Sequence, residues 1–289
     1  MRVAILGMGA IGHVMSRALD GRTELVKIDR TRAPLRDDER PVEAAVITTK
    51  TPGTAWAADI AAKLLIPDGV ALTIQNGLGN YETLVTAVGA DRAAVGVIYV
   101  GAQLVDGELR ATGAGKVELG RPAGARPREK LDALAKILSA GGMDVTVVDD
   151  PWPSVWRKVV TNAAVNPLSA LLRKTNAELL ADAPACRIAD GLAREVARVA
   201  SASGVAIGED DAVRQWRAMA ALTGANRSSM LQDVEAGRAT EADAISGAVA
   251  REGERRGIAA PLNLAMALLV SAVHPDSALP STGAGTRGG

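Results

Sequence analysis

The chain has 289 residues, of which 48% are hydrophobic and 23% charged, and its formal net charge at pH 7 is +0. This length allows one large or two medium domains, and the composition is that of a soluble globular protein. A neutral chain offers nucleic acid or an anionic membrane no electrostatic attraction, and an aromatic content of 2% provides no platform for stacking bases. We therefore expect a small-molecule partner, no nucleic acid and no membrane.

Cysteine and histidine are too scarce for a disulfide or a metal site. Cys186 is the only cysteine, which excludes an intrachain disulfide and favours a cytoplasmic location. His13 and His274 are the only histidines, and neither has further ligands at a recognisable spacing, so we expect no metal. The longest apolar stretch, Leu264 to Val273, is shorter than the roughly 20 residues that a membrane-spanning helix needs.

A glycine-rich motif follows the first predicted strand. The apolar run Val3 to Leu6 is typical of a buried parallel strand, and Gly7-Met8-Gly9-Ala10-Ile11-Gly12 comes directly after it, opening a predicted helix over Ile11 to Leu19. Gly7 would permit the tight turn, Gly9 a close approach of the backbone to a pyrophosphate, and Gly12 close packing of helix on strand. The motif predicts a dinucleotide site, and the alternative is a glycine turn that serves packing only.

Charged and amide side chains follow the next predicted strands. The strand Leu25 to Ile28 ends in Asp29-Arg30, where an acid favours NAD and an arginine favours NADP; we favour NADP and leave NAD open. Lys50 follows a strand over Ala44 to Thr48. Asn76 follows a strand over Val70 to Ile74 and lies among glycines that leave room for a ligand. The alternatives are solvated charges for Arg30 and Lys50 and an Asn-Gly turn for Asn76.

The remaining predicted elements complete an α/β, Rossmann-like dinucleotide-binding domain over residues 1–150. Residues 32–43 are expected to form a loop or a trimmed crossover. The other elements are a helix over Thr54 to Leu65, a turn at Pro67 to Gly69, a strand over Ala93 to Val100, a short antiparallel meander at the sheet edge (105–108 and 117–120), a helix over Arg128 to Ala140 and a strand over Val145 to Val148. Residues 149–153 are expected to form a hinge.

The stretch Trp156 to Pro167 is predicted to be a largely buried helix that ends or kinks at the proline. On a helix Lys158, Asn162 and Asn166 recur every fourth residue, so that an ammonium and two carboxamides share one face. If that face lines a cleft, Lys158 can donate a proton while the amides hold a small polar substrate. The alternative is a lysine at a helix end with two asparagines bonded to neighbouring backbone.

Beyond Pro167 an all-α domain is predicted over residues 151–275, followed by a disordered tail over 276–289. Its predicted helices are one begun by a capping box of Thr175 and Glu178, and others over Ala185 to Ala202, Asp210 to Leu222, Met230 to Glu235, Glu241 to Arg256 and Pro261 to Val273. Asn226 and Ser229 precede or open a helix and could hold a carboxylate, although Ser229 with Gln232 is also an ordinary capping box. Glu241 at a helix start could simply stabilise that helix.

Taken together, these motifs resemble those of the ketopantoate reductase (2-dehydropantoate 2-reductase) family. They occur in the family's order: G-M-G-A-I-G at 7–12, T-T-K at 48–50, Q-N-G-L-G at 75–79, W-R-K-x-x-x-N-x-x-x-N-P-L at 156–168, and N-R-S-S-M-L-Q-D with G-R-x-T-E within 226–241. Two departures are the short segment 32–43 and the pairing of Asp29 with Arg30.

The resemblance implies NADPH-dependent reduction of a 2-oxo acid, ketopantoate to pantoate, in coenzyme A synthesis. It implies that the loop 7–12 holds the pyrophosphate and that Lys158 is the proton donor, with Glu241 near the nicotinamide and the reacting oxygen. It also suggests a homodimer. The implied cofactor residues are Gly7, Met8, Gly9, Ala10, Ile11, Gly12, Arg30, Lys50, Asn76, Ala102 and Glu241, and the implied substrate residues are Asn76, Lys158, Asn162, Asn166, Asn176, Asn226 and Ser229.

Two other functions remain open from the sequence. A Lys and an Asn four residues apart on a helix also suit dehydrogenases of other 2-oxo or 3-hydroxy acids. A non-catalytic dinucleotide sensor or scaffold is the second alternative, but binding a dinucleotide would not need the row of asparagines. A panel of 2-oxo acids with both cofactors separates these readings.

Overall fold

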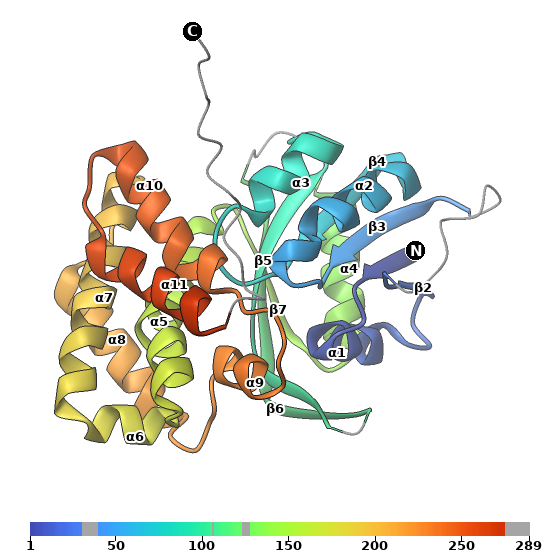
Figure 1. Cartoon of the computed structure of the whole chain (residues 1–289). Coiled ribbons are helices and arrows are strands. Elements are labelled where there is room, and N and C mark those ends of the chain that lie inside the picture. Colours follow the sequence, from blue (N-terminus) through green and yellow to red (C-terminus); the bar gives the residue numbers. More distant parts are fainter. Residues whose placement is uncertain (31–39, 106, 123–127, 275–289) are drawn as a thin grey trace, which may run out of the picture. The chain divides into compact units, whose positions relative to one another are not determined.

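A computed structural model describes residues 1–30, 40–105, 107–122 and 128–274. The chain forms two compact units, Met1–Lys158 and Val159–Gly289. One continuous helix, α5 (Trp152–Leu172), contains the boundary between them (Figure 1). Most of the predicted loop or crossover at 32–43 and the predicted tail at 276–289 lie outside the described residues.

The first unit is built on a seven-stranded sheet with the order β2-β1-β3-β4-β5-β6-β7. Strands β1 to β5 run parallel to one another, whereas β6 runs antiparallel to β5 and β7 is parallel to β6. The Rossmann-like fold class predicted from the sequence is therefore confirmed. The strands are β1 (Arg2–Leu6), β2 (Glu24–Ile28), β3 (Val42–Ile47), β4 (Leu65–Thr73), β5 (Ala93–Val105), β6 (Glu108–Gly120) and β7 (Asp144–Val148).

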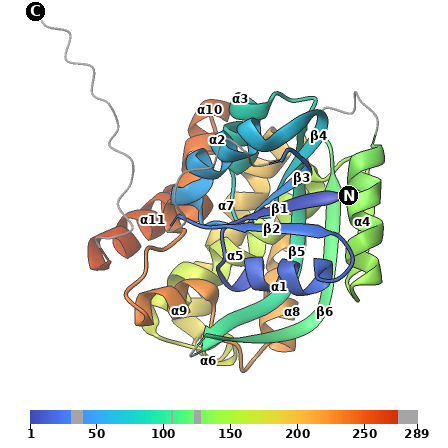
Figure 2. The ribbon, with the colours of Figure 1, turned by 90° about the vertical axis from the view of Figure 1, so that its right-hand side faces the viewer.

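Helices cover both faces of this sheet, as Figure 2 shows. One face packs on α1 (Ala10–Leu19) and α4 (Glu129–Ala140), and the other on α2 (Thr54–Leu64) and α3 (Asn80–Val88). A sheet buried on both faces explains why residues 3–6 of β1 and 44–47 of β3 form continuous apolar runs. Alanines on the buried face of α2 let that helix lie close to the strands.

The pairing of β5 with β6 differs from the prediction. Both strands have 13 residues and form one long antiparallel hairpin, in place of a short meander. They are not at the edge of the sheet, because β7 pairs with β6 and is the edge strand itself. The second half of β5 lacks an apolar run, so its extension depends on pairing with β6 rather than on hydrophobic pattern.

The start of β4 also differs from the prediction of a turn at Pro67 to Gly69. Strand β4 begins at Leu65, directly after α2, and pairs Leu65 with Val42 and Val70 with Ala44. The intervening residues therefore bulge out of the ladder, which is where a strand tolerates proline and glycine. Backbone pairing on both sides of the bulge extends the strand through a sequence typical of turns.

The second unit is helical, as predicted. After α5 it contains α6 (Asn176–Ala181), α7 (Ala183–Ala202), α8 (Glu209–Leu222), α9 (Ser229–Glu235), a π-helical turn η2 (Asp243–Gly247), α10 (Ala248–Arg256) and α11 (Pro261–Val273). The capping box of Thr175 and Glu178 is confirmed at α6. Within the described residues, none of the helices is long and apolar enough to cross a membrane, and no cluster of three or more potential ligands could hold a metal ion.

Two local features of this unit differ from the predictions, which gave an end or a kink at Pro167 and a helix start at Glu241. Pro167 does not end α5, which continues to Leu172. The residues around the proline are buried, so packing outweighs the hydrogen bond that the ring removes. The predicted helix from Glu241 to Arg256 begins after Glu241 with a π turn, and this irregularity has no signature in hydrophobic periodicity.

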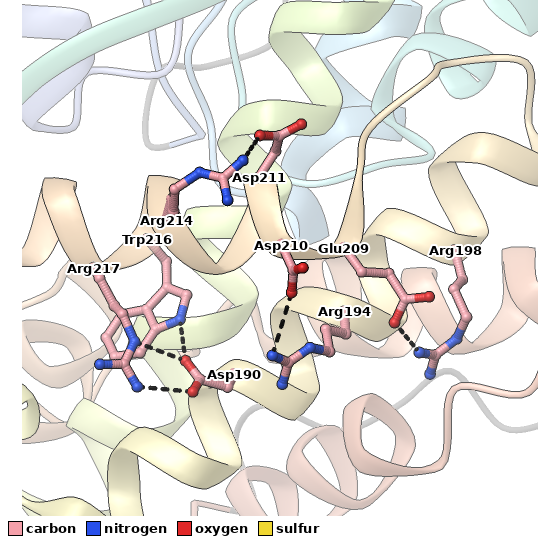
Figure 3. A network of polar contacts seen from close by, with 9 residues as sticks. All are labelled: Asp190, Arg194, Arg198, Glu209, Asp210, Asp211, Arg214, Trp216 and Arg217. Carbon is pink, nitrogen blue, oxygen red and sulfur yellow. Dashed lines mark hydrogen bonds and ion pairs between the residues drawn. The ribbon is translucent and has the colours of Figure 1, made fainter.

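A polar network joins α7 to α8 (Figure 3). The indole Nε1 of the fully buried Trp216 donates to Asp190 Oδ1 at 3.0 Å, and Arg217 donates to both carboxylate oxygens at 3.0 and 2.8 Å. Burial acts to raise the pKa of Asp190, but the hydrogen bonds from Arg217 and Trp216 outweigh it and the pKa is lowered. The carboxylate therefore stabilises the folded state in its charged form.

We expect Asp190→Asn to lower the free energy of unfolding by about 1–3 kcal/mol at neutral pH, because one acceptor oxygen becomes a donor facing Arg217. Since the folded pKa is lowered, this contribution is present above the unfolded pKa and is lost as the pH falls through the folded pKa. Urea unfolding should therefore show a difference from the wild type that shrinks in acid. Asp211→Asn removes the exposed pair with Arg214 and is the control; an equal loss in both variants would contradict the argument.

Candidate active site

The glycine loop lies at the carboxyl end of β1 and leads into α1. Gly7 has φ +108°, and a Cβ there would come within 2.7 Å of Thr49 N. A Cβ on Gly12 would lie 2.1 Å from Gly7 O, which is the close packing that the sequence predicts. A Cβ on Gly9 would meet nothing within 4 Å. The N-cap of α1 is Gly9 itself, so this open space lies beside N–H groups of the first helical turn.

This arrangement fits the phosphates of a dinucleotide. Positive φ at Gly7 turns the backbone, close packing at Gly12 holds helix to loop, and the space over Gly9 leaves room for an anion at the positive end of the helix dipole. Met8, Ala10 and Ile11 are half-buried in the same loop and first turn. The six residues predicted to bind the pyrophosphate thus form one continuous segment between the carboxyl end of β1 and the first turn of α1.

Arg30, Lys50 and Asn76 follow the carboxyl ends of three parallel strands of the same sheet, namely β2, β3 and β4, and β1 lies between β2 and β3. The carboxyl ends of parallel strands lie at the same end of the sheet. Strands β2 and β3 lie on opposite sides of β1, so the strand order reverses there, and the crevice at the carboxyl end of β1 is the usual place for a ligand. Lys50 and Asn76 are half-buried, whereas Arg30 is exposed. Ala102 is half-buried in the part of β5 that extends beyond its pairing with β4.

Two contacts hold the exposed Arg30 near the turn η1 (Thr51–Gly53), which follows Lys50. Its Nη2 donates to Pro52 O at 2.6 Å, and its guanidinium lies 6.0 Å from the ring centroid of Trp56 on α2. A cation over an indole face is attracted by the ring quadrupole. No motif in the sequence marks Trp56 as a neighbour of Arg30. The feature that could have pointed to it is its position shortly after the T-T-K motif at 48–50.

Lys158 is fixed to the sheet by its side chain. Its Nζ donates to Ile98 O on β5 at 2.8 Å. Strands β4 and β5 pair Thr73 with Val95, so Ile98 and Asn76 each lie three residues beyond that pair. The amine therefore binds β5 beyond its last pair with β4, towards the carboxyl end of the parallel strands, and Asn76 follows the end of β4 on the same side of that pair.

The first turn of α5 explains this placement. Ser154 donates to Glu118 on β6, and Val155 packs against Val95 and Val97 on β5. These contacts attach the helix to the sheet one turn before Lys158. Burial raises the pKa of Glu118, but hydrogen bonds from Lys116 and Ser154 outweigh burial and the pKa is lowered, which keeps this anchor charged.

The helix α5 continues without a break past Lys158, so Asn162 and Asn166 follow on the same face at successive turns. Asn162 is half-buried and Asn166 is buried. The alternative of a lysine at a helix end is therefore wrong, because Lys158 lies in the interior of a 21-residue helix.

In the helical unit, Asn176 and Asn226 are brought together, with Asn176 N donating to Asn226 O at 3.1 Å. Asn176 Nδ2 donates to Thr223 Oγ1 at 2.8 Å, while Asn176 Oδ1 is buried without a hydrogen-bond partner among the described residues. Ser229 and Glu241 come from two further segments of this unit. Ser229 is exposed at the first position of α9, and Glu241 is buried just before η2.

The predicted capping box of Ser229 with Gln232 is wrong. The cap of α9 is Ser228, whose Oγ accepts from Leu231 N at 3.1 Å, and Gln232 Nε2 instead donates to Arg227 O at 2.9 Å. Two adjacent serines cannot be told apart by the capping pattern, because either one places a hydroxyl near the helix start. Ser229 is consequently not the residue that caps this helix.

Comparison with known proteins identifies the family of the chain. Residues 21–124 match the family model described as ketopantoate reductase PanE/ApbA, and residues 152–274 match its C-terminal model. The chain is 35% identical to the 2-dehydropantoate 2-reductase of Halobacterium salinarum over 89% of this chain and 84% of that protein.

Solved structures with the same fold include the 2-dehydropantoate 2-reductase of Geobacter metallireducens (TM-score 0.81, 27% identity, 94% of this chain and 99% of that one). Another is a complex of D-mandelate dehydrogenase with NADH (TM-score 0.85, 24% identity, 95% and 99%), a likeness that shows the fold alone. The resemblance seen in the sequence is confirmed: the chain belongs to the ketopantoate reductase family of NAD(P)-dependent oxidoreductases.

Proposed function

We propose that this protein reduces 2-dehydropantoate to pantoate with NADPH, a step of pantothenate and coenzyme A synthesis. The observation that carries the proposal is the position of Lys158, whose Nζ is bound to Ile98 O beyond the last β4–β5 pair, towards the carboxyl end of the parallel strands. The name of the Halobacterium salinarum relative supports the choice of substrate.

The residues of the chain would act on the oxygen of the ketone. A reduced nicotinamide, when bound, supplies the hydride to the carbonyl carbon, and the carbonyl oxygen then gains negative charge. Lys158 stabilises that charge and donates a proton from Nζ, which leaves an alcohol and a neutral amine that water reprotonates. Ile98 O orients the amine, whose ammonium form carries three N–H groups.

We assign the same residues to the ligands as the family motifs suggest. The loop from Gly7 to Gly12 holds the pyrophosphate, Arg30 the 2'-phosphate, and Lys50, Asn76 and Ala102 line the cofactor. The contacts of Arg30 with Pro52 and Trp56 support NADPH over NADH, because they orient the guanidinium before the ligand arrives. Asn162, Asn166, Asn176, Asn226 and Ser229 hold the substrate, and Glu241 lies near the reacting oxygen.

A substrate panel with NADPH and NADH in parallel tests the proposal. We expect loss of absorbance of the reduced cofactor to be fastest with ketopantoate and NADPH. The solved D-mandelate dehydrogenase makes the 2-oxo acid of mandelate a necessary member of the panel. Faster turnover of another 2-oxo acid would replace the substrate, and tight NADPH binding without turnover of any member would favour a non-catalytic protein.

We also propose a cytoplasmic homodimer. The single, buried cysteine suits a reducing compartment. Helix α11 exposes several large apolar side chains, namely Leu264, Leu268, Leu269 and Val273. A ketopantoate reductase of Staphylococcus aureus with the same fold is described as dimeric. Sedimentation velocity of the wild type and of Leu268→Glu decides between a dimer through α11 and a monomer.

A further inference from the structure

A continuous chain of side-chain hydrogen bonds joins residues at and after the end of β4 to the first residues of α2 and α3. Thr73 Oγ1 donates to Gln75 Oε1 at 2.9 Å, and Gln75 Nε2 donates to Thr54 Oγ1 at 2.8 Å. Thr54 Oγ1 in turn donates to Asn80 Oδ1 at 2.8 Å, and Asn80 Nδ2 donates to the main-chain oxygen of Asn76 at 2.9 Å. Residues from β4, α2 and α3 are thus joined in one sequence of bonds.

The direction of every bond in this chain is determined by its neighbours. Each of the two carboxamides accepts with its oxygen and donates with its nitrogen, and the Thr54 hydroxyl accepts one bond and donates the next. Turning either amide over would place donor against donor or acceptor against acceptor. Thr73, Thr54 and Asn80 are at most 4% exposed, so water does not compensate for a broken bond.

The chain connects the two loops that carry Lys50 and Asn76. At one end, Gln75 Nε2 lies 2.8 Å from Thr49 O, which directly precedes Lys50. At the other end, the bond from Asn80 holds the main chain of Asn76 itself. Gln75 directly precedes Asn76, so its bond to Thr49 O joins the two loops, and the Thr54 hydroxyl adds a second connection that runs from Gln75 Nε2 through Asn80 to Asn76 O.

We propose that Thr54 and Asn80 are positioning residues, which touch neither ligand but hold Lys50 and Asn76 in the geometry for reaction. The proposal rests on the proposed function in one respect, namely that Lys50 and Asn76 line the bound cofactor. A purely structural role would lower stability and leave the activity of each folded molecule unchanged. A positioning role lowers activity as well, since small displacements of an aligned group cost much of its effect.

Thr54→Val removes the hydroxyl with almost no change in shape and therefore breaks the chain in its middle. We expect kcat/KM for the preferred 2-oxo acid to fall about 10- to 100-fold, whereas Thr54→Ser, which keeps the hydroxyl, stays within about threefold of the wild type. Asn263→Ala is the matched control, because it removes buried amide bonds to Leu192 O and Glu195 in the helical unit. It should lower the melting temperature and leave kcat/KM unchanged.

A second variant tests whether the bonds act as one chain. Asn80→Asp keeps the acceptor for Thr54 but places an oxygen against Asn76 O, so that only the last bond is lost. In the double variant with Thr54→Val, the loss of kcat/KM should be clearly smaller than the product of the two single losses, because both changes interrupt the same coupling. Multiplicative losses would mean that the two residues act independently.

Amide hydrogen exchange separates this proposal from the choice of substrate. In Thr54→Val the amides of residues 49–50 and 76–79 should exchange at least about fivefold faster than in the wild type, irrespective of which acid is reduced. If exchange in both loops and kcat/KM stay within twofold of the wild type, the positioning role is overturned. Faster exchange in a protein that reduces no 2-oxo acid would refute the proposed function and leave the coupling of the loops intact.

Discussion

Lys158→Ala is expected to lower kcat for the preferred 2-oxo acid by about 10³- to 10⁴-fold, because one side chain both stabilises the alkoxide and supplies its proton. The affinity for NADPH, measured by fluorescence titration, should stay within about twofold, since the proposed cofactor contacts come from the glycine loop and the strand ends. Stopped-flow single turnovers should show that the loss lies in the chemical step and not in the binding of either ligand.

Two further variants refine this test. Lys158→Arg keeps a cation but cannot release a proton near neutral pH, so it should recover part of the charge stabilisation and little of the proton transfer. Arg157→Ala removes the neighbouring exposed cation on α5 and is the control for a general change of charge. A Lys158→Ala enzyme with more than about a tenth of the wild-type kcat would remove this lysine from the mechanism.

Gly12→Ala and Gly9→Ala are expected to impair NADPH binding for different physical reasons. The Cβ of Gly12→Ala would lie 2.1 Å from Gly7 O, so the loop must move; we expect about 1–3 kcal/mol less stability and at least about a hundredfold weaker NADPH binding. The Cβ of Gly9→Ala meets no protein atom within 4 Å, and φ −75° suits alanine. Stability should therefore be unchanged while the methyl group occupies the space proposed for the phosphates.

Urea unfolding and fluorescence titration of both variants check this pair of results. If Gly9→Ala bound NADPH as tightly as the wild type, the pyrophosphate would not lie over Gly9. If Gly12→Ala bound NADPH normally, the packing of α1 on the glycine loop would be irrelevant to the site. The contrast between the two glycines is sharper than either result alone, because only one of them costs folding energy.

Much of the site could be predicted because parallel strands impose a simple rule. Residues that follow parallel strands of one sheet lie at the same end of that sheet, and this puts Arg30, Lys50 and Asn76 at the end where the glycine loop follows β1. The spacing of Lys158, Asn162 and Asn166 likewise determines a shared helical face. These inferences depend only on where the apolar runs end and on the spacing of residues along a helix, and both can be seen in the sequence.

Tertiary structure decided the features that depend on residues far apart in the chain. Ile98 O is 60 residues from Lys158, and Asn80 is 26 residues from Thr54; no local pattern marks either partner. The same reason accounts for the long β5–β6 hairpin and for the continuation of α5 past Pro167, where pairing and packing outweigh local preference. The sequence by itself determined which side chains could do the chemistry, and long-range contacts decided where their atoms are held, because hydrogen-bond partners are selected by the folded backbone.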